Sequence, residues 1–276
     1  MVNIKNLFLL IFILILSSAF INGEKDRQTK LVSQHTFAKG EQLEFKVHFG
    51  IFNVGKATME VNQQIYKINN KPSYKVDISG WTTGAVSWVS KVDDNWGAYI
   101  DSSNLLPHIS WRNIKEGRYR KNELVNFDHQ NNIIETKVID NQTGKFKDPV
   151  TFDAPENIRD LIGGYLFVRH IDFSHLKEKD TIKLNAFFED TIYNFNILYR
   201  GKEKVKTKAG HFNAIKLVPV MPDNKMFAGE NSVTLWLSDD KNRIPIKAEA
   251  NMFIGKAGCE LIGYNGLKEP PNLYKK

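Results

Sequence analysis

Cysteine is nearly absent from this chain of 276 residues, since Cys259 is the only one. A single cysteine excludes a disulfide within the chain, so buried apolar surface and backbone hydrogen bonds must hold the fold. Cys259 lies in the segment GKAGCELIGY, which has the pattern of a β-strand, and no histidine stands beside it. We interpret it as a small buried thiol and not as a nucleophile.

Long hydrophobic runs are also absent, apart from residues 7–16. That run follows Lys5 and precedes a short stretch of small residues ending at Ala19, which is the layout of a secretory signal peptide. We predict a signal peptide over residues 1–23, cleaved after Ala19 or, as a second choice, after Gly23. The run is shorter than the roughly 20 residues of a membrane span, so an uncleaved anchor is the weaker alternative. The sequence therefore predicts an exported, periplasmic protein.

A strong excess of one charge sign is missing as well: 38 lysines and arginines face 31 acids, and the formal net charge is +7. The lysines are spread over the chain, with no basic helix and no basic aromatic cluster of the kind that binds nucleic acid. We expect neither nucleic acid nor nucleotide as a partner. Mild attraction to an anionic membrane surface or glycan is compatible with this charge.

The common catalytic and cofactor motifs are absent. Residues 50–57, GIFNVGKA, approach a phosphate-binding loop, but Ala57 stands where a hydroxyl should hold magnesium, and the following residues read as a strand. The seven histidines form no zinc motif, and no G-x-S-x-G is present. We predict a β-hairpin at residues 50–57, no metal, no cofactor and no catalytic residues.

Short segments of alternating hydrophobicity dominate the chain from residue 41 onward. In EQLEFKVHFG, Leu43, Phe45, Val47 and Phe49 share one face and polar residues share the other. Similar segments recur with turn signals about every ten residues, which is typical of an antiparallel barrel or sandwich. We predict a mainly β fold, an antiparallel open β-barrel or half-barrel of the lipocalin or lipoprotein-carrier type.

One segment, DAPENIRDLIGGYLFVRH, has apolar residues at helical spacing, with Asp153 as a candidate N-cap. We predict a helix over residues 155–169 that packs on the concave face of the sheet. No linker divides the chain. The expected organisation after the signal peptide is a flexible segment over residues 24–37, one β domain over residues 38–265, and a loose tail over residues 266–276.

The segment WLSDDKNRIPIKAEA, residues 236–250, resembles a functional site because two adjacent acids stand beside two cations. A calcium loop needs acids or amides at alternate positions after Asp239, where Lys241 and Arg243 stand instead. Apolar residues alternate on both sides of the polar part. We predict a hairpin with a polar turn, with Pro245 at a bulge or with its backbone nitrogen toward solvent.

Aromatic residues are the best candidates for a ligand site. Four of the five tryptophans fall within residues 81–111, with small residues between two of them in GWTTGAVSWVS. Tryptophans either fill the core of a barrel or line a cavity for an apolar or sugar ligand, and one sequence leaves both interpretations open. The candidate ligand-binding residues are Trp81, Trp88, Trp96, Trp111, Tyr165 and Trp236.

Several of these segments together resemble a known family. They are GEQLEFKVHFGIFNVGKATMEV, DDNWGAYIDSSNLLPHISWRNIKEGRY, KTKAGHFNAIKL and LWLSDDKNRIPIKAEA. The chain resembles the DUF3108 family of exported bacterial proteins over roughly residues 38–265. The resemblance implies an exported β-rich domain, and it transfers no catalytic residues.

From these observations we expect a non-catalytic binding or carrier protein for an apolar or amphipathic envelope ligand, a lipid or a glycan. The first alternative is a structural protein that docks an envelope protein through a sheet edge or a basic face. The second is an envelope glycan hydrolase, in which dispersed acids such as Asp93, Asp94 and Asp239 would converge on one cleft.

Overall fold

Fourteen antiparallel strands form one sheet in the computed structural model of this chain, which describes residues 30–220, 229 and 231–274. The strands are β1 (Gln42–Phe49), β2 (Phe52–Ile68), β3 (Lys71–Thr82), β4 (Asp93–Asp101), β5 (Pro107–Glu116), β6 (Tyr119–Asp128), β7 (Ile133–Val138), β8 (Val150–Asp153), β9 (Thr181–Phe188), β10 (Thr191–Thr207), β11 (Gly210–Pro219), β12 (Val233–Ser238), β13 (Pro245–Met252) and β14 (Gly255–Asn265). The predicted signal peptide, residues 1–23, lies outside the described residues.

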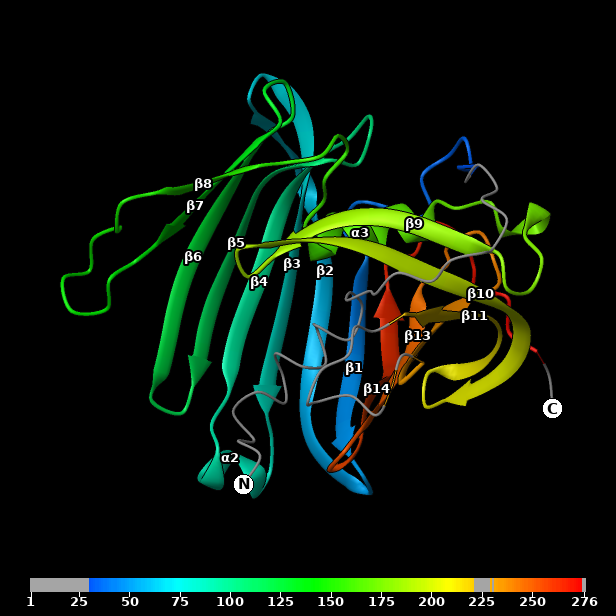
Figure 1. Ribbon diagram of the computed structural model, residues 1–276. Helices are drawn as coiled ribbons and strands as arrows, with labels where there is room; N and C mark the ends of the chain where they lie inside the picture. Colours follow the sequence, from blue (N-terminus) through cyan, green and yellow to red (C-terminus); the bar gives the residue numbers. More distant parts are fainter. Residues whose placement is uncertain (1–29, 221–228, 230, 275–276) are drawn as a thin grey trace.

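Strands that follow one another along the chain are neighbours in the sheet, with one exception. The order is β8-β7-β6-β5-β4-β3-β2-β1-β14-β13-β12-β11-β10-β9, so the first strand pairs with the last and the chain breaks the meander between β8 and β9. These two strands form the edges and do not pair with each other. The sheet curves without closing (Figure 1), which confirms the predicted mainly β, open-barrel fold.

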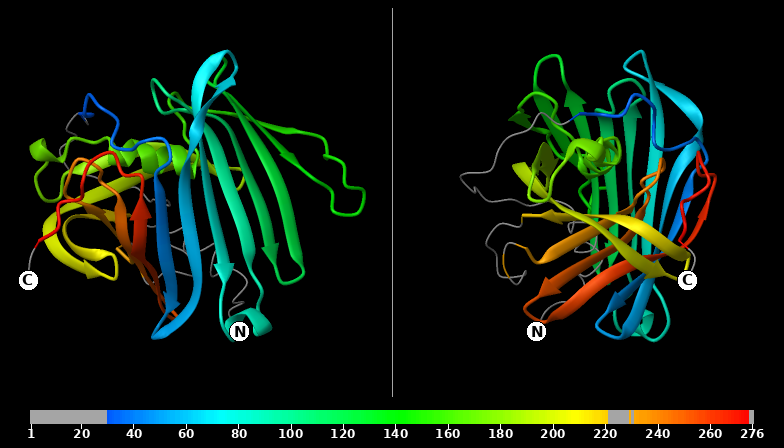
Figure 2. Two further views of the ribbon diagram at one scale, coloured as in Figure 1. Left: turned by 180° about the vertical axis from the view of Figure 1, so that it is seen from behind. Right: turned by 90° about the vertical axis from the view of Figure 1, so that its right-hand side faces the viewer.

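The helix α3 (Leu161–Arg169) lies within the curve of the sheet, where it contacts β4 on one side and β9 on the other (Figures 1 and 2). Leu166 is fully buried, and Ile162 and Val168 are 2% exposed. The helix thus contributes apolar side chains to the core in several directions, as a central element does. The prediction of a helix on the concave face is confirmed.

The predicted start of this helix, residue 155, was wrong. The helix begins at Leu161, and Asp160 is its N-cap, accepting a hydrogen bond from the Gly163 N–H at 2.8 Å. Arg159 instead forms a backbone bridge to Ala186 of β9. Pairing with a strand requires extended backbone, so the residues before the cap cannot be helical.

The alternation predicted for β1 is present in the structure, where Leu43, Phe45 and Val47 are buried. Residues 50–57 form a turn and the start of β2, as predicted, since Phe49 pairs with Phe52. The strands β12 and β13 form the predicted hairpin, and the register shifts where Leu237 meets Pro245. That irregularity is the bulge expected for a proline without a backbone donor.

Two short helices complete the described secondary structure: α2 (Val86–Val89) between β3 and β4, and the 3-10 helix η2 (Phe173–His175) after α3. The described segments outside the sheet also make hydrogen bonds. The Val32 N–H donates to the His170 carbonyl at 2.8 Å, and the Tyr274 N–H donates to the His211 carbonyl at 2.9 Å. The ends of the described chain are thereby attached to α3 and to β11.

Candidate functional site

Two small cavities adjoin α3 on the concave side of the sheet, and Leu161 and Ile162 contribute to the walls of both. One, about 70 Å³, is lined mainly by apolar side chains from β1, β2, β3, β12, β13 and β14. The other, about 30 Å³, contains charged residues of β5, β6 and the end of β9. The first turn of the helix therefore separates an apolar compartment from a polar one.

The apolar cavity has a simple cause in the register of the sheet. Phe45 of β1 pairs with Ala57 of β2, which pairs with Gly80 of β3, so two small residues lie side by side. On the other side, Cys259 of β14 pairs with Ala248 of β13. Small side chains at adjoining inward positions cannot fill the space beneath a helix, and a cavity remains.

Cys259 contributes to the wall of this apolar cavity. Burial raises the pKa of its thiol to about 12. The thiol is therefore protonated at neutral pH and is a poor nucleophile, because the thiolate is the reactive form.

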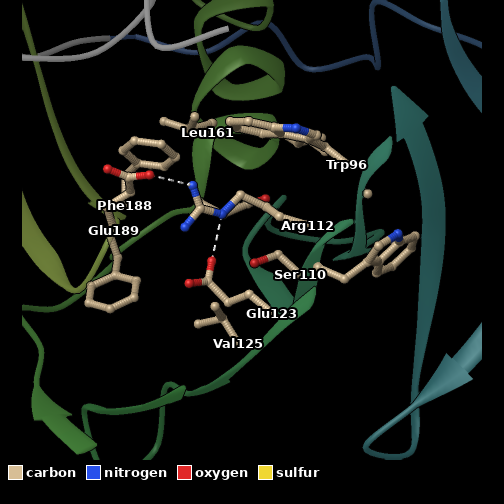
Figure 3. A pocket seen from close by; sticks show the side chains of 13 residues that line it. Trp96, Ser110, Arg112, Glu123, Val125, Leu161, Phe188 and Glu189 are labelled. Carbon is tan, nitrogen blue, oxygen red and sulfur yellow. Dashed lines mark hydrogen bonds and ion pairs between the residues drawn. The ribbon is translucent and has the colours of Figure 1, made fainter. Parts of the chain in front are cut away.

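The polar cavity is organised by Arg112, as Figure 3 shows. The Arg112 Nε donates to Glu123 Oε2 at 2.5 Å, and Nη1 donates to Glu189 Oε1 at 3.1 Å. The Arg112 side chain is 7% exposed, whereas that of Glu189 is 44% exposed. Glu189 thus closes the pocket from the solvent side, and Glu123 holds the arginine from β6.

Aromatic rings border the same guanidinium group. Its central carbon lies 4.5 Å from the centre of the Phe188 ring and 5.4 Å from that of Trp96. Trp96 and Phe188 stack on each other, with centres 5.8 Å apart and an angle of 17° between the planes. Such contacts stabilise a buried cation and hold its plane in a fixed orientation.

One nitrogen of this arginine has no partner. Arg112 Nη2 is buried and makes no hydrogen bond within the structure. A buried donor without an acceptor costs on the order of 1–3 kcal/mol. Burial acts to raise the pKa of Glu123, but hydrogen bonds and charge from Arg112 and Lys121 outweigh it, so this pKa lies below its ordinary value. The pocket thus holds ionised acceptors beside one free donor.

A second buried group of acids lies on the same face of β4 and β5. Asp94 and Glu116 are 4% and 2% exposed, and their carboxyl groups share a hydrogen bond. Burial, followed by the charge of Asp94 and this hydrogen bond, raises the pKa of Glu116 to about 8. Burial raises the pKa of Asp94 to about 6. The two carboxyls therefore share a proton over much of the neutral pH range.

The acids considered for a hydrolase do not converge. Asp94 is buried beside Glu116, whereas the exposed Asp93 lies 3.7 Å from the Lys115 ammonium. Asp239 lies 2.8 Å from the ammonium of Lys202. Each acid has a separate environment, so the geometry gives no support to a carboxylate pair made from these three residues.

Among the candidate ligand residues, the structure brings three to the walls of the two cavities. Trp96 lies over the polar pocket, Trp111 contributes to the wall of the same pocket, and Tyr165 of α3 contributes to the apolar one. The Tyr165 hydroxyl accepts a hydrogen bond from Arg169 at 3.0 Å.

The four tryptophans other than Trp96 differ from one another in their surroundings. Trp111 lies on the opposite face of β5 from Arg112, donates to Asn95 at 3.0 Å and contacts Tyr99. Trp81 is half-buried at the end of β3, Trp88 is 90% exposed on α2, and Trp236 is buried on β12. The six candidates thus do not form one aromatic cavity.

The DDKNR turn of the β12–β13 hairpin holds the end of α3. The fully buried Arg169 of the helix donates to the Asn242 carbonyl at 2.7 Å and 3.1 Å. Arg243 donates in return to the carbonyls of Arg169 and Ile171. The turn identified in the sequence as a site-like segment therefore fixes the position of the helix.

The part of the chain that the structure describes contains no group of three or more histidine, cysteine, aspartate or glutamate side chains arranged to hold a metal ion. Within the same residues, no helix has both the length and the apolar character needed to cross a membrane.

Arg112, Glu123 and Glu189 were not predicted from the sequence. Nothing in the local pattern marks them, because Glu189 stands 77 positions after Arg112 in the chain. One signal for a polar site was present in the segment PHISWRNIKE, residues 107–116. There the polar residues His108, Ser110 and Arg112 alternate along the chain and so share one face of the strand. Polar residues on one face of an otherwise apolar strand suggest a buried polar network only when that face is known to point inward.

An open β-barrel with a central helix and a half-polar, half-apolar interior defines the class of this protein. The chain belongs to the family of proteins of unknown function DUF3108, whose model matches residues 44–261. This confirms the resemblance noted in the sequence. No curated protein matches the chain.

Solved structures of low sequence identity share the fold. A β-barrel-like protein with a DUF1849 domain from Brucella abortus is 8% identical, with a TM-score of 0.55, and the match covers 84% of this chain and 98% of that one. A protein described as exported, with a YmcC-like fold, from Bacteroides fragilis is 9% identical, with a TM-score of 0.36 and coverage of 84% and 100%. The first of these supports the fold assignment alone.

Proposed function

We propose that this chain is an exported, non-catalytic binding or carrier protein that takes up an amphipathic molecule of the cell envelope on its concave side. The observation that carries the proposal is the adjacency of the two cavities, which share Leu161 and Ile162. An apolar compartment next to a pocket with a few directed polar groups is typical of small-molecule sites. The leader-like N-terminus supports export.

The polar pocket favours an uncharged head group that both donates and accepts hydrogen bonds. Arg112 Nη2 lacks an acceptor, while the carboxylates of Glu123 and Glu189 are acceptors on either side of the same arginine. An anionic head group would meet two negative charges. A hydroxyl or amide group satisfies the free donor without that repulsion, as in the head of a glycolipid or a glycan.

The apolar cavity, about 70 Å³, sets the other half of the specificity. A cavity of this size accommodates a short apolar group, and burying each methylene there contributes about 0.8 kcal/mol. Affinity should therefore rise about fourfold with each added methylene until the cavity is full.

Alkyl glucosides of increasing chain length, used below their micelle concentrations, test this function by titration calorimetry. For the natural chain we expect the affinity to rise with each added methylene. In Ala57→Leu we expect this dependence on chain length to be lost, because the larger side chain occupies the cavity. Ala57→Ser is the matched control, since it keeps the cavity open. Affinity that is independent of chain length, or equal in the two variants, would contradict the proposal.

Native mass spectrometry of protein exported by its own host provides a second test. We expect a retained small molecule that carries an alkyl chain and a hydroxyl- or amide-rich head. Repeated recovery of the chain without any retained molecule, together with no glucoside binding, would exclude a carrier function.

A further inference from the structure

Four hairpin connections meet at one end of the open barrel. In an antiparallel meander the connections alternate between the two ends. Of those on one side, β1–β2, β3–β4, β5–β6 and β13–β14 lie together at the bottom of Figure 1, whereas the β7–β8 connection, which contains Asp140 and Asp148, extends away from them. The register places β1–β2 and β13–β14 together, because Phe49 pairs with both Phe52 and Ala257. We call this the α2 end, after the short helix that it contains (Figure 1). It comprises residues 50–56, 83–92, 117–122 and 252–258.

Large apolar side chains project from this end into solvent. The five most exposed large hydrophobic residues of the described chain all lie here: Ile51 (91% exposed), Trp88 (90%), Val89 (81%), Phe253 (68%) and Phe52 (67%). They come from three separate connections. Single exposed hydrophobic residues are normal on a protein surface, but such a concentration at projecting tips marks an interaction site.

The charges within these four segments are of one sign, and the exposed Asp93 that follows residue 92 is paired with Lys115. The four segments contain no aspartate or glutamate, and their cations are Lys56, Lys91, Arg118, Arg120, Lys121 and Lys256. Two of these pair with acids outside the segments, Lys121 with Glu123 and Lys256 with Glu249. Lys56, Lys91 and Arg118 are exposed. The end therefore combines apolar tips with a positive field.

The opposite end has a different chemistry. Its connections β2–β3, β4–β5, β6–β7 and β12–β13 have the sequences NN, SSNLL, HQNN and DDKNRI, and their apolar residues Leu105, Leu106 and Ile244 are buried. Asn69, Asn70 and Asn132 adopt positive φ there, as asparagine does in tight turns. Apolar tips are thus not a general property of the turns in this sheet but a property of one end.

We propose that the α2 end docks on the surface of an anionic lipid bilayer. Trp88, Phe52 and Phe253 enter the head-group region, and the exposed cations face the lipid phosphates. Separate apolar points surrounded by cations match a soft, anionic surface, where tryptophan is favoured and each nearby cation contributes attraction. A protein partner would instead require a continuous complementary face. The docking does not depend on any ligand in the concave cavities.

The first experiment follows Trp88 directly. Protein exported by its host, so that its N-terminus has its natural form, is mixed with vesicles of phosphatidylcholine, alone or with phosphatidylglycerol, whose acyl chains carry bromine. We expect tryptophan fluorescence to be quenched by the mixed vesicles, and the quenching to be mostly lost in Trp88→Phe. Absence of quenching in the folded natural chain overturns the proposal.

The second experiment uses two matched charge reversals and measures partition into the mixed vesicles by sedimentation. Lys56→Glu with Lys91→Glu changes the α2 end, and Lys67→Glu with Lys241→Glu changes exposed lysines elsewhere by the same amount. We expect partition to fall at least about tenfold in the first pair and to change little in the second. Equal effects of the two pairs overturn the proposal.

An apolar triple variant, Phe52→Ser, Trp88→Ser and Phe253→Ser, distinguishes lipid from a second copy of the chain. Its three positions are exposed, so folding should be retained, as circular dichroism would verify. We expect weaker partition and an unchanged oligomeric state. The opposite result would be a natural chain that self-associates and a triple variant that is monomeric but binds vesicles as before. That result would assign the α2 end to a contact between copies of the chain and overturn the proposal.

Discussion

One ion pair in the interior of this protein is held by several hydrogen bonds. Arg169 is fully buried and donates to both carboxylate oxygens of Glu41, at 2.6 Å and 3.0 Å. It also donates to the carbonyl of Thr36 at 2.9 Å. Burial lowers the stability of the cation, but the charge of Glu41 outweighs this and raises the arginine pKa. The pair links the N-terminal segment, α3 and the β12–β13 turn.

Removing one partner of this pair should be costly. We expect Arg169→Met to lower the free energy of unfolding by about 3–5 kcal/mol, because Glu41 is then left as a buried, unpaired charge. Lys75→Met is the control, since Lys75 and Asp77 pair at 2.8 Å on the surface and such pairs contribute about 1 kcal/mol or less. Urea unfolding of both variants measures the difference, and similar losses would contradict the assignment.

The pH dependence of stability should carry a signature of Glu116. Its pKa is about 8 in the folded chain, against an ordinary value of 4.5. Between these values the folded chain retains a proton that the unfolded chain has released, so stability falls as pH rises, by at most about 1.4 kcal/mol per pH unit. Glu116→Gln stays neutral in both states, and we expect its stability to decline less between pH 6 and 8. Urea unfolding at several pH values gives the free energy of unfolding of both chains. If this free energy changed with pH equally in the natural chain and in Glu116→Gln, the raised pKa of Glu116 would be contradicted.

Among the elements, β5 shows why the polar pocket was not predictable. Its apolar residues Ile109 and Trp111 lie on the outer face and are half-buried, whereas His108, Ser110 and Arg112 point inward. Alternation alone would assign the opposite orientation. The inward position of Arg112 is stabilised by ion pairs with Glu123 of β6 and with Glu189, which follows β9, and such partners are not visible in the sequence of one strand.

The β12–β13 hairpin was predictable as a turn, but its role was not. Asp240 Oδ1 accepts hydrogen bonds from the Ser238 hydroxyl and from the N–H groups of Asn242 and Arg243, and Oδ2 accepts one from the Asn272 N–H. The adjacent acids looked equivalent in the sequence. In the structure one of them organises the turn and the other makes an exposed ion pair.

We therefore expect the two acids of this turn to differ in a stability measurement. Asp240→Ala removes the acceptor of four hydrogen bonds and should lower the free energy of unfolding by about 2–3 kcal/mol. Asp239→Ala removes a surface ion pair with Lys202 and should cost about 1 kcal/mol or less. Thermal or urea unfolding compares the pair, and a larger loss for Asp239→Ala would refute this account.

At the scale of the whole molecule, the strands and the meander follow from alternation and turn signals, but the closure of β1 on β14 is a contact between distant parts of the chain. The register of that closure sets Cys259 of β14 beside Val47 of β1, and so brings Cys259 and Ala248 into the wall of the same apolar cavity as Phe45 and Ala57. Sequence patterns predict which residues alternate and do not predict which strands become neighbours. The cavities and the α2 end could therefore be recognised only once the strands were placed.

The chemical difference between the two ends predicts a fixed orientation on a membrane. The native Cys259 has a thiol pKa of about 12, so it should react slowly, and a cysteine introduced at an exposed position can be labelled selectively. An environment-sensitive bimane label at Ile51→Cys, on the α2 end, should shift to shorter wavelength with anionic vesicles, because the tip leaves water. The same label at the exposed Gln130→Cys, on the opposite end, should not change. Labelling of the natural chain gives the background. Equal shifts at both positions would mean that the molecule has no preferred orientation, and a shift at Gln130→Cys alone would reverse the assignment of the two ends.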